Sequence, residues 1–338
     1  MTPNPFATLE TIAVALGSAE AIASTERPAR WQAVMALSKG IEQFRTDPRT
    51  LVMLCEAMTH ETDCRIMQQC VLLIAQLKPL SAVRQLILIA MADDDGEALA
   101  VYKPPHGPVI KSGDDGMRLR VAAIRALALI KDERAIEPLM AILNNREDNY
   151  RVRLAAADAL GKLGNQQAVA PLLEIVNDDR ERSAYLKESA IQALGVLGDL
   201  RAMTPLIDML ESKRGFRDKF QFLVEKVVEA IGRIGNHADQ DIPEAVRSLL
   251  KALDDDAPSI RLAAVESLGW MGQRVSRDAL EALQARVFDT NDEVALAAVD
   301  AVTEVGGLHA LQELLEHENL PNQLREAVLQ AIMNIQLE

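Results

Sequence analysis

The sequence predicts an all-α protein, a solenoid in which about nine similar helical hairpins follow one another along the chain. Hydrophobic residues make up 49% of the chain but aromatic residues only 3%, so small aliphatic side chains must fill most of the core. Such side chains allow helix axes to approach closely. A motif of the form R-x-x-A-x-x-A-L-G-x-L-G recurs along the chain, and no segment alternates apolar and polar residues as a strand would.

The leucine of this motif, which we call the anchor residue, sets the repeat. It recurs at intervals of 30 to 37 residues, apart from one interval of 55, and a basic residue stands seven positions before it in most copies. One hairpin cannot bury its own apolar face, so the copies must stack on one another. The predicted anchors are Leu37, Leu72, Leu127, Leu160, Leu194, Ile231, Leu268, Val302 and Ile332.

Each repeat is predicted to begin with a helix, such as 151–164, that ends at a glycine, where a left-handed residue commonly stops a helix. A second helix follows, such as 165–176, with a proline in its first turn. Residues 1–27 are expected to form an N-terminal cap. Residues 92–117, rich in proline, glycine and acidic residues, are expected to form an inserted loop. We expect the whole chain, 1–338, to be a single domain.

Composition excludes several classes of protein. The net charge of −14 leaves no basic face for a nucleic acid backbone. Three cysteines grouped within 55–70 are no disulfide framework, which favours a reducing compartment. No basic residue precedes Arg27, and no apolar run approaches the roughly 18 to 20 residues that a membrane span needs. We therefore expect a cytoplasmic protein with neither a signal peptide nor a membrane insertion.

The repeats resemble HEAT repeats, in particular the short type of the phycobilisome bilin-lyase subunits, the PBS lyase HEAT-like repeats. The resemblance extends from Arg30 to Gln336. It implies a right-handed superhelix whose concave surface holds a protein partner. The partners that it implies are a phycobiliprotein, a photosystem component or an iron–sulfur carrier of the IscA type. The family includes lyases, chaperones, scaffolds and a metal hydroxylase, so the fold alone does not select a function.

Positions six before, two before and two after the anchor form one stripe on the first helix of each repeat. In the later copies the middle position is mostly charged or polar, so the stripe is expected to face water. In the first three copies the stripe as a whole is mostly apolar. This predicts a partner-binding patch beside the inserted loop. The alternative is that the cap or the loop buries these residues, with Cys70 serving as packing. The predicted patch consists of Trp31, Met35, Ile66, Cys70, Ile74, Val121 and Leu129, with Tyr102 of the loop.

In the later copies the same stripe is acidic, and we expect it to attract a basic surface of a partner. The alternative is a solvated acidic face that keeps the protein soluble. The residues of this predicted acidic groove are Glu225, Glu229, Glu266, Asp300 and Glu304.

The sequence offers no catalytic constellation. The metal hydroxylase branch of the family uses His-Glu pairs, and two such pairs occur here, at 60–61 and 317–318. They stand out of phase and at opposite ends of the chain, so we predict no metal site, no cofactor and no catalytic residue. The predicted function is a non-enzymatic protein-binding scaffold or assembly factor. The alternative is a phycobilin lyase-isomerase, or a subunit of one.

Overall fold

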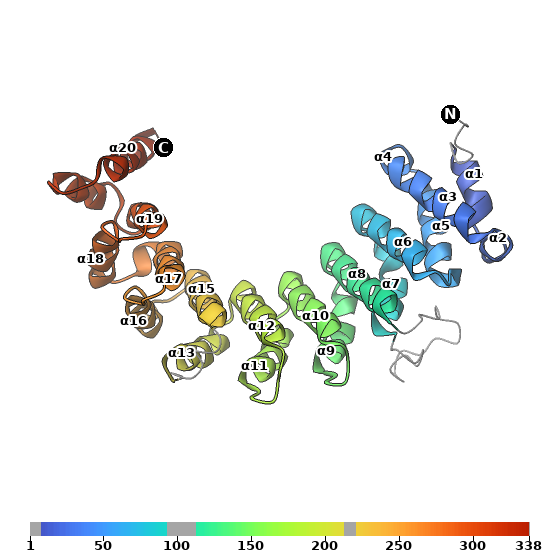
Figure 1. Ribbon diagram of the computed structural model, residues 1–338, viewed down its shortest axis with the longest axis horizontal. Coiled ribbons are helices and arrows are strands. Elements are labelled where there is room, and N and C mark those ends of the chain that lie inside the picture. Colours follow the sequence, from blue (N-terminus) through green and yellow to red (C-terminus); the bar gives the residue numbers. More distant parts are fainter. Residues whose placement is uncertain (1–7, 93–112, 213–220, 338) are drawn as a thin grey trace. The chain divides into compact units, whose positions relative to one another are not determined.

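The computed structural model describes residues 8–92, 113–212 and 221–337 (Figure 1). These residues form helices joined by short turns, and no strand occurs among them, which confirms the predicted all-α fold. The chain divides into two compact units, Met1–Asn165 (unit 1) and Gln166–Glu338 (unit 2). Most of the predicted inserted loop, including Tyr102, lies outside the described residues. The handedness of the superhelix and the single domain remain predictions.

Unit 1 begins with two short helices that pack on the first hairpin of the stack. Helix α1 (Leu9–Leu16) contacts α3 (Arg27–Lys39) and α5 (Pro48–His60), and α2 (Ala19–Ser24) contacts α1 and α5. The two short helices therefore cover an end of the stack formed by α3 and α5. The other helices of unit 1 are α4 (Ile41–Phe44), α6 (Cys64–Leu77), α7 (Val83–Met91), α8 (Asp114–Ile130), α9 (Ile136–Asn144) and α10 (Tyr150–Leu163).

Unit 2 repeats the same alternation of first and second helices. One of its helices, α19, is broken at Gly307, whose φ of 59° and ψ of −151° are not helical. The helices of unit 2 are α11 (Val169–Asn177), α12 (Ala184–Leu197), α13 (Met203–Ser212), α15 (Gln221–His237), α16 (Pro243–Ala252), α17 (Pro258–Met271), α18 (Arg277–Arg286), α19 (Asp292–Glu316) and α20 (Asn322–Leu337).

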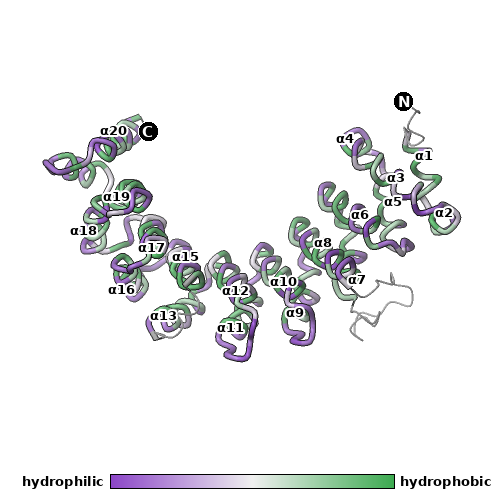
Figure 2. Tube along the Cα trace, in the orientation of Figure 1, coloured by the Kyte–Doolittle hydropathy of each residue, from purple (hydrophilic) through white to green (hydrophobic). Residues whose placement is uncertain are grey.

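The first helices of successive repeats pack on one another within each unit, α3–α6–α8–α10 in unit 1 and α12–α15–α17–α19–α20 in unit 2. The glycine after the anchor makes this approach possible. A Cβ atom added at Gly232 would lie 2.3 Å from Cβ of Ser267, and one added at Gly195 would lie 3.2 Å from Cβ of Ala230. Hydrophilic residues gather instead in the turns that follow α9 and α11 (Figure 2).

The recurrent arginine before the anchor joins successive hairpins. Arg120 donates from Nε to the carbonyl of Ala90, at the end of the preceding hairpin, at 3.0 Å. Its two terminal nitrogens donate to Asp148, which precedes the next first helix, at 2.8 and 2.6 Å. Arg261 and Asp289 repeat this bidentate pair in unit 2, at 2.9 and 2.7 Å. The motif therefore keeps its basic residue because that residue satisfies buried carbonyls and a buried carboxylate together.

One described helix, α19, is long and apolar enough by length and composition to cross a membrane. The break at Gly307 divides it into two segments, each shorter than the roughly 20 residues that a spanning helix needs. The helix also packs against α17, α18 and α20. We therefore interpret α19 as a core element of unit 2.

Candidate functional site: the exposed face of the first helices

The repeat register of α6 differs from the one that the sequence predicts. The predicted anchor, Leu72, is 44% exposed, whereas Ile74 is completely buried, as the anchors of the neighbouring repeats are. The residue that follows α6, Lys78, is left-handed with a φ of 52° and caps the helix. Helix α8 ends at a left-handed residue, Lys131, four positions after its buried anchor Leu127. Lys78 likewise stands four positions after Ile74, so Ile74 is the anchor of α6.

This two-residue shift corrects the predicted partner-binding patch. Ile66, Cys70 and Ile74 were predicted to face water, but all three are completely buried. In the corrected register Cys70 corresponds to Ala123 of α8, a core position, and not to an exposed charged one. The burial follows from packing against α3, α5 and α8 and not from the N-terminal cap, whose helices contact α3 and α5.

Burial also defines the chemistry of the thiol. The loss of solvent, together with the negative charge of Glu61 and the nearby Cys55, raises the pKa of Cys70 far above its ordinary value. A thiol that stays protonated inside a core is neither a metal ligand nor a nucleophile. Cys70 is therefore a packing residue.

We use the term first-helix face for the side formed by residues six before, two before and two after each corrected anchor. In unit 1 this face carries an apolar row on α3, α6 and α8. Trp31, Leu72 and Leu129 are exposed, and Met35 and Val121 are half-buried. The sequence does not predict that Leu72 is exposed, because Leu72 occupies the predicted anchor position, which is expected to be buried. In the corrected register Leu72 is the apolar contribution of α6, because the other two positions of its face hold Gln68 and Gln76. The partner-binding patch stays a prediction.

In unit 2 the face becomes acidic, beginning at α15. Lys226 donates to Glu229 at 2.6 Å and lies 3.1 Å from Glu225, so these two half-buried carboxylates share one cation. Burial alone would lower the pKa of Lys226, but the hydrogen bonds to Glu229 and Glu225 outweigh it and raise that pKa. Arg233 also lies 4.0 Å from Glu229, so both members of the predicted acidic groove are paired within the protein.

The other three members surround a pocket of about 420 Å³ between α17 and α19. Glu266, Asp300 and Glu304 are exposed, and no ion pair involves them within the described part of the chain. Small residues line this pocket where α17 and α19 approach each other closely. A Cβ atom on Gly269 would already lie 3.1 Å from Cβ of Ala301. The indole of Trp270 completes the lining.

Each of the three carboxylates stands near another negative charge. Asp300 and Glu304 are one helical turn apart on α19, where like charges are unfavourable. Desolvation by the packed helices, and then the charge of Glu229, raise the pKa of Glu266 above its ordinary value. A positive charge in the pocket would relieve this repulsion.

The indole of Trp270 already contacts one guanidinium of the protein itself. The guanidinium carbon of Arg233, on the neighbouring helix α15, lies 5.5 Å from the centroid of the indole ring. Tryptophan is the best aromatic partner for a cation. Acidic groups beside an indole can therefore hold an arginine or lysine side chain by charge and ring contact together.

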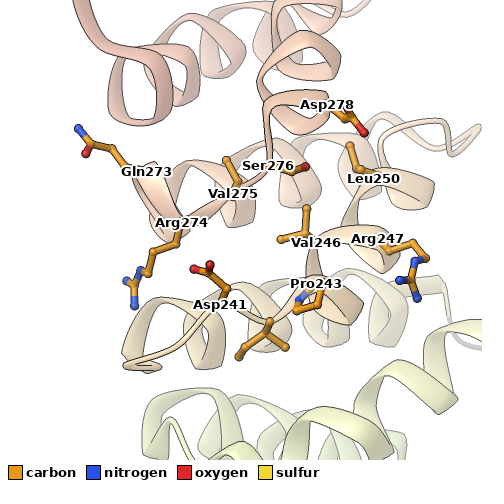
Figure 3. A pocket seen from close by; sticks show the side chains of 11 residues that line it. Asp241, Pro243, Val246, Arg247, Leu250, Gln273, Arg274, Val275, Ser276 and Asp278 are labelled. Atoms are coloured by element: carbon orange, nitrogen blue, oxygen red, sulfur yellow. The ribbon is translucent and has the colours of Figure 1, made fainter.

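A second pocket of unit 2, of about 570 Å³, lies where α16 and α18 begin (Figure 3). Its apolar residues include Val246 and Leu250, and both signs of charge stand at its edge. Arg274 is held by the protein itself, since it donates to the carbonyls of Asn236 and Ala238. With mixed charges and a committed arginine, this pocket has no feature that selects one kind of ligand.

One member of each His-Glu pair makes a contact of another kind. Glu61 accepts a bidentate pair of hydrogen bonds from Arg30, at 2.7 and 3.0 Å, and is buried. The ring of His317 packs edge-on against Phe288, with centroids 5.5 Å apart. Across the described ranges, no group of three or more His, Cys, Asp and Glu side chains could hold a metal ion.

Comparisons with known proteins identify the repeat. A family model for HEAT repeats matches residues 109–195 and 223–303, and one for the PBS lyase HEAT-like repeat matches residues 186–212. A comparison with curated proteins found no significant match.

Several solved structures are similar. The chain is 14% identical to Kap95 in the Kap95:Nup1 complex, with a TM-score of 0.58 over 97% of this chain and 46% of that one. It is 24% identical to a chain of the complex of CpcE and CpcF of phycocyanin lyase from Nostoc, with a TM-score of 0.43 over 64% of this chain and 89% of that one. The chain thus spans about half of Kap95, and the likeness concerns the fold.

Proposed function

This chain belongs to the HEAT-repeat proteins, and we propose that it is a non-enzymatic scaffold or assembly factor that holds a protein partner on its first-helix face. The observation that carries the proposal is the pocket between α17 and α19. There, three carboxylates without an ion pair stand beside the exposed indole of Trp270. Such a pocket suits an arginine or lysine side chain that the partner inserts.

The apolar row of unit 1 provides a second kind of contact. Exposed aromatic and aliphatic side chains commonly contribute most of the binding energy of an interface, more than about 1 kcal/mol each when they are truncated. Trp31, Leu72 and Leu129 are such residues. A partner with an apolar surface for unit 1 and a basic segment for unit 2 would use both. From the resemblance of the repeats, the partners to test first are a phycobiliprotein, a photosystem component and an iron–sulfur carrier.

The acidic pocket is tested with the triple variant Glu266→Gln, Asp300→Asn and Glu304→Gln. The partner is first isolated by its co-purification with the wild-type chain from native extract. We expect the triple variant to bind it at least about tenfold more weakly, corresponding to roughly 1.4 kcal/mol. The association rate of the wild type should also fall as salt is raised through 0.1–0.15 M, where charges are screened beyond roughly 8–10 Å.

A matched control removes the same amount of charge elsewhere. Glu133, Glu137 and Glu147 are exposed residues of unit 1 outside the first-helix face, and each can be replaced by glutamine. This control is expected to bind like the wild type. Equal binding by the triple variant and the control, or an association rate that ignores salt, would refute the role of the pocket.

A second candidate function is that of a phycobilin lyase-isomerase or a lyase subunit, because the repeat at residues 186–212 matches the PBS lyase type. This alternative predicts that the purified chain changes the visible absorbance of an added bilin. An unchanged spectrum, together with a stable complex with a protein partner, would favour the scaffold.

A further inference from the structure

Helix α20 is buried differently from the other first helices. In α17, the anchor Leu268 and the residue three positions before it, Val265, are completely buried. The corresponding residues of α20 are Ile332, which is half-buried, and Leu329, which is 45% exposed. Only Leu324 and Val328 are buried in the whole of α20. One side of α20 that is a core surface in other repeats therefore lies open in the described structure.

The residue after the anchor differs as well. In α12, α15 and α17 it is a glycine, against which the next first helix packs. In α20 it is Met333, a large residue that is 49% exposed. A further repeat that packed as closely as α15 packs on Gly195 of α12 would have no room for this side chain. The open side of α20 is therefore suited to another kind of contact than the next turn of the solenoid.

The exposed residues of α20 form one continuous apolar stripe. Leu329, Ile332, Met333 and Leu337 stand at positions i, i+3, i+4 and i+8, which lie on one side of a helix. Contiguous exposed apolar side chains of this kind mark interaction surfaces. The polar Gln330 is turned to a neighbour on its own helix, donating to Asn334 at 2.9 Å.

The charge of α20 favours a second copy of the same chain as the occupant. The chain carries a net charge of −14, so most of its surfaces repel their own copies. Helix α20 has only one basic and one acidic residue, Arg325 and Glu326, which cancel. Arg325 is directed back into its own unit, where it donates to the carbonyls of Leu315 and His317. The stripe is therefore an uncharged surface on a strongly acidic protein.

The order of residues is also suited to pairing with itself. Residues 329–337 read L-Q-A-I-M-N-I-Q-L, in which Leu329 and Gln330 before the central Met333 are mirrored by Gln336 and Leu337 after it. The two inner pairs, Ala331 with Ile335 and Ile332 with Asn334, are not identical. In an antiparallel pair with a two-fold axis at Met333, Leu329 of one copy meets Leu337 of the other. The flexible methionine side chains meet at the axis, where they adapt to each other. A two-fold interface requires such a self-complementary surface.

We propose that the chain forms a homodimer in which two copies of α20 pack antiparallel about Met333. The full-length protein, at 37.0 kDa per chain, is expected to show twice that mass by light scattering and by sedimentation equilibrium. The variant Met333→Asp brings two like charges together at the axis and is expected to be monomeric at the same concentrations. Because Met333 is exposed within the unit, Met333→Asp should remain folded and should melt like wild-type protein that has been diluted to the monomer.

The matched control is Val14→Asp on α1, which changes an exposed valine far from α20 in the sequence. It is expected to remain dimeric. The variant Met333→Cys tests the axis directly, because two thiols that meet there should form an interchain disulfide on mild oxidation. Val14→Cys and the wild type should not be cross-linked. A wild type that is monomeric throughout, a dimer that persists in Met333→Asp, or no cross-link at Met333→Cys would overturn the proposal.

Discussion

The first-helix faces of the two units use the same repeat positions for different side chains. In unit 1 several exposed residues of this face are apolar, as at Leu72 and Leu129, whereas in unit 2 several are acidic, as at Glu266 and Asp300. The opposite side of the same helices hardly changes, because it is filled by small aliphatic residues in both units. Positions without a packing role are free to vary, and the variation gives the exposed face of each unit different side chains.

The largest expected change in the free energy of unfolding tests which side of α6 faces the core. Cys70→Asp places a carboxylate in a completely buried site near the buried Glu61, and should destabilise the fold by about 3 kcal/mol or more. Leu72→Asp, two residues away on the exposed side, should change stability by less than about 0.5 kcal/mol. Thermal or denaturant unfolding measures both. If the two variants melt alike, the corrected register of α6 is wrong.

A second pair of variants compares a joining arginine with an exposed one. Arg120→Met leaves the buried carboxylate of Asp148 without its main partner, and we expect a loss of about 3 kcal/mol. Arg125→Met, on the exposed first-helix face of the same helix, should cost less than about 0.5 kcal/mol. The unfolding free energies are compared in denaturant. A tolerated Arg120→Met would mean that the paired arginine is not what joins successive hairpins.

The sequence predicts the architecture because the residues that pack successive hairpins together recur in many copies of the repeat. The anchor and the arginine recur often enough that the repeat can be recognised even though a few copies lack one of them. The register of α6 was wrong because two local features imitated the motif. Arg65 stood where the joining arginine was expected, while the true position holds Met67. A buried alanine eight positions after the anchor, Ala82 in this repeat and Ala135 in the next, would have fixed the register.

The acidic groove was predicted only in part, for a physical reason. Its members share a repeat position, so their common face follows from the helical period. The sequence does not contain the spacing between helices that makes a pocket beside Trp270. Nor does the sequence show that Lys226 pairs with Glu225 and Glu229 while the other three carboxylates have no ion-pair partner among the described residues. Those facts depend on which side chains meet across α15, α17 and α19.

A smaller effect concerns the pocket itself. Because the pKa of Glu266 is raised in the folded protein, its ionisation opposes folding above that pKa, and the opposition disappears as pH falls through it. Glu266→Gln should therefore stabilise the protein slightly at neutral pH, by a few tenths of a kcal/mol for so exposed a group. The gain should vanish in acid. Melting temperatures across pH measure this, and a variant less stable than the wild type at neutral pH would contradict it.

The most direct test of the partner-binding face uses the two tryptophans of the chain, since Trp31 lies on the face in unit 1 and Trp270 in unit 2. Trp31→Phe and Trp270→Phe each leave one indole to report on one unit. The fluorescence of each variant is followed while the isolated partner is added, with the partner's own emission subtracted. If the partner lies on both faces, each remaining indole loses water, and both spectra should shift to the blue. Two unchanged spectra at saturating partner would contradict the account.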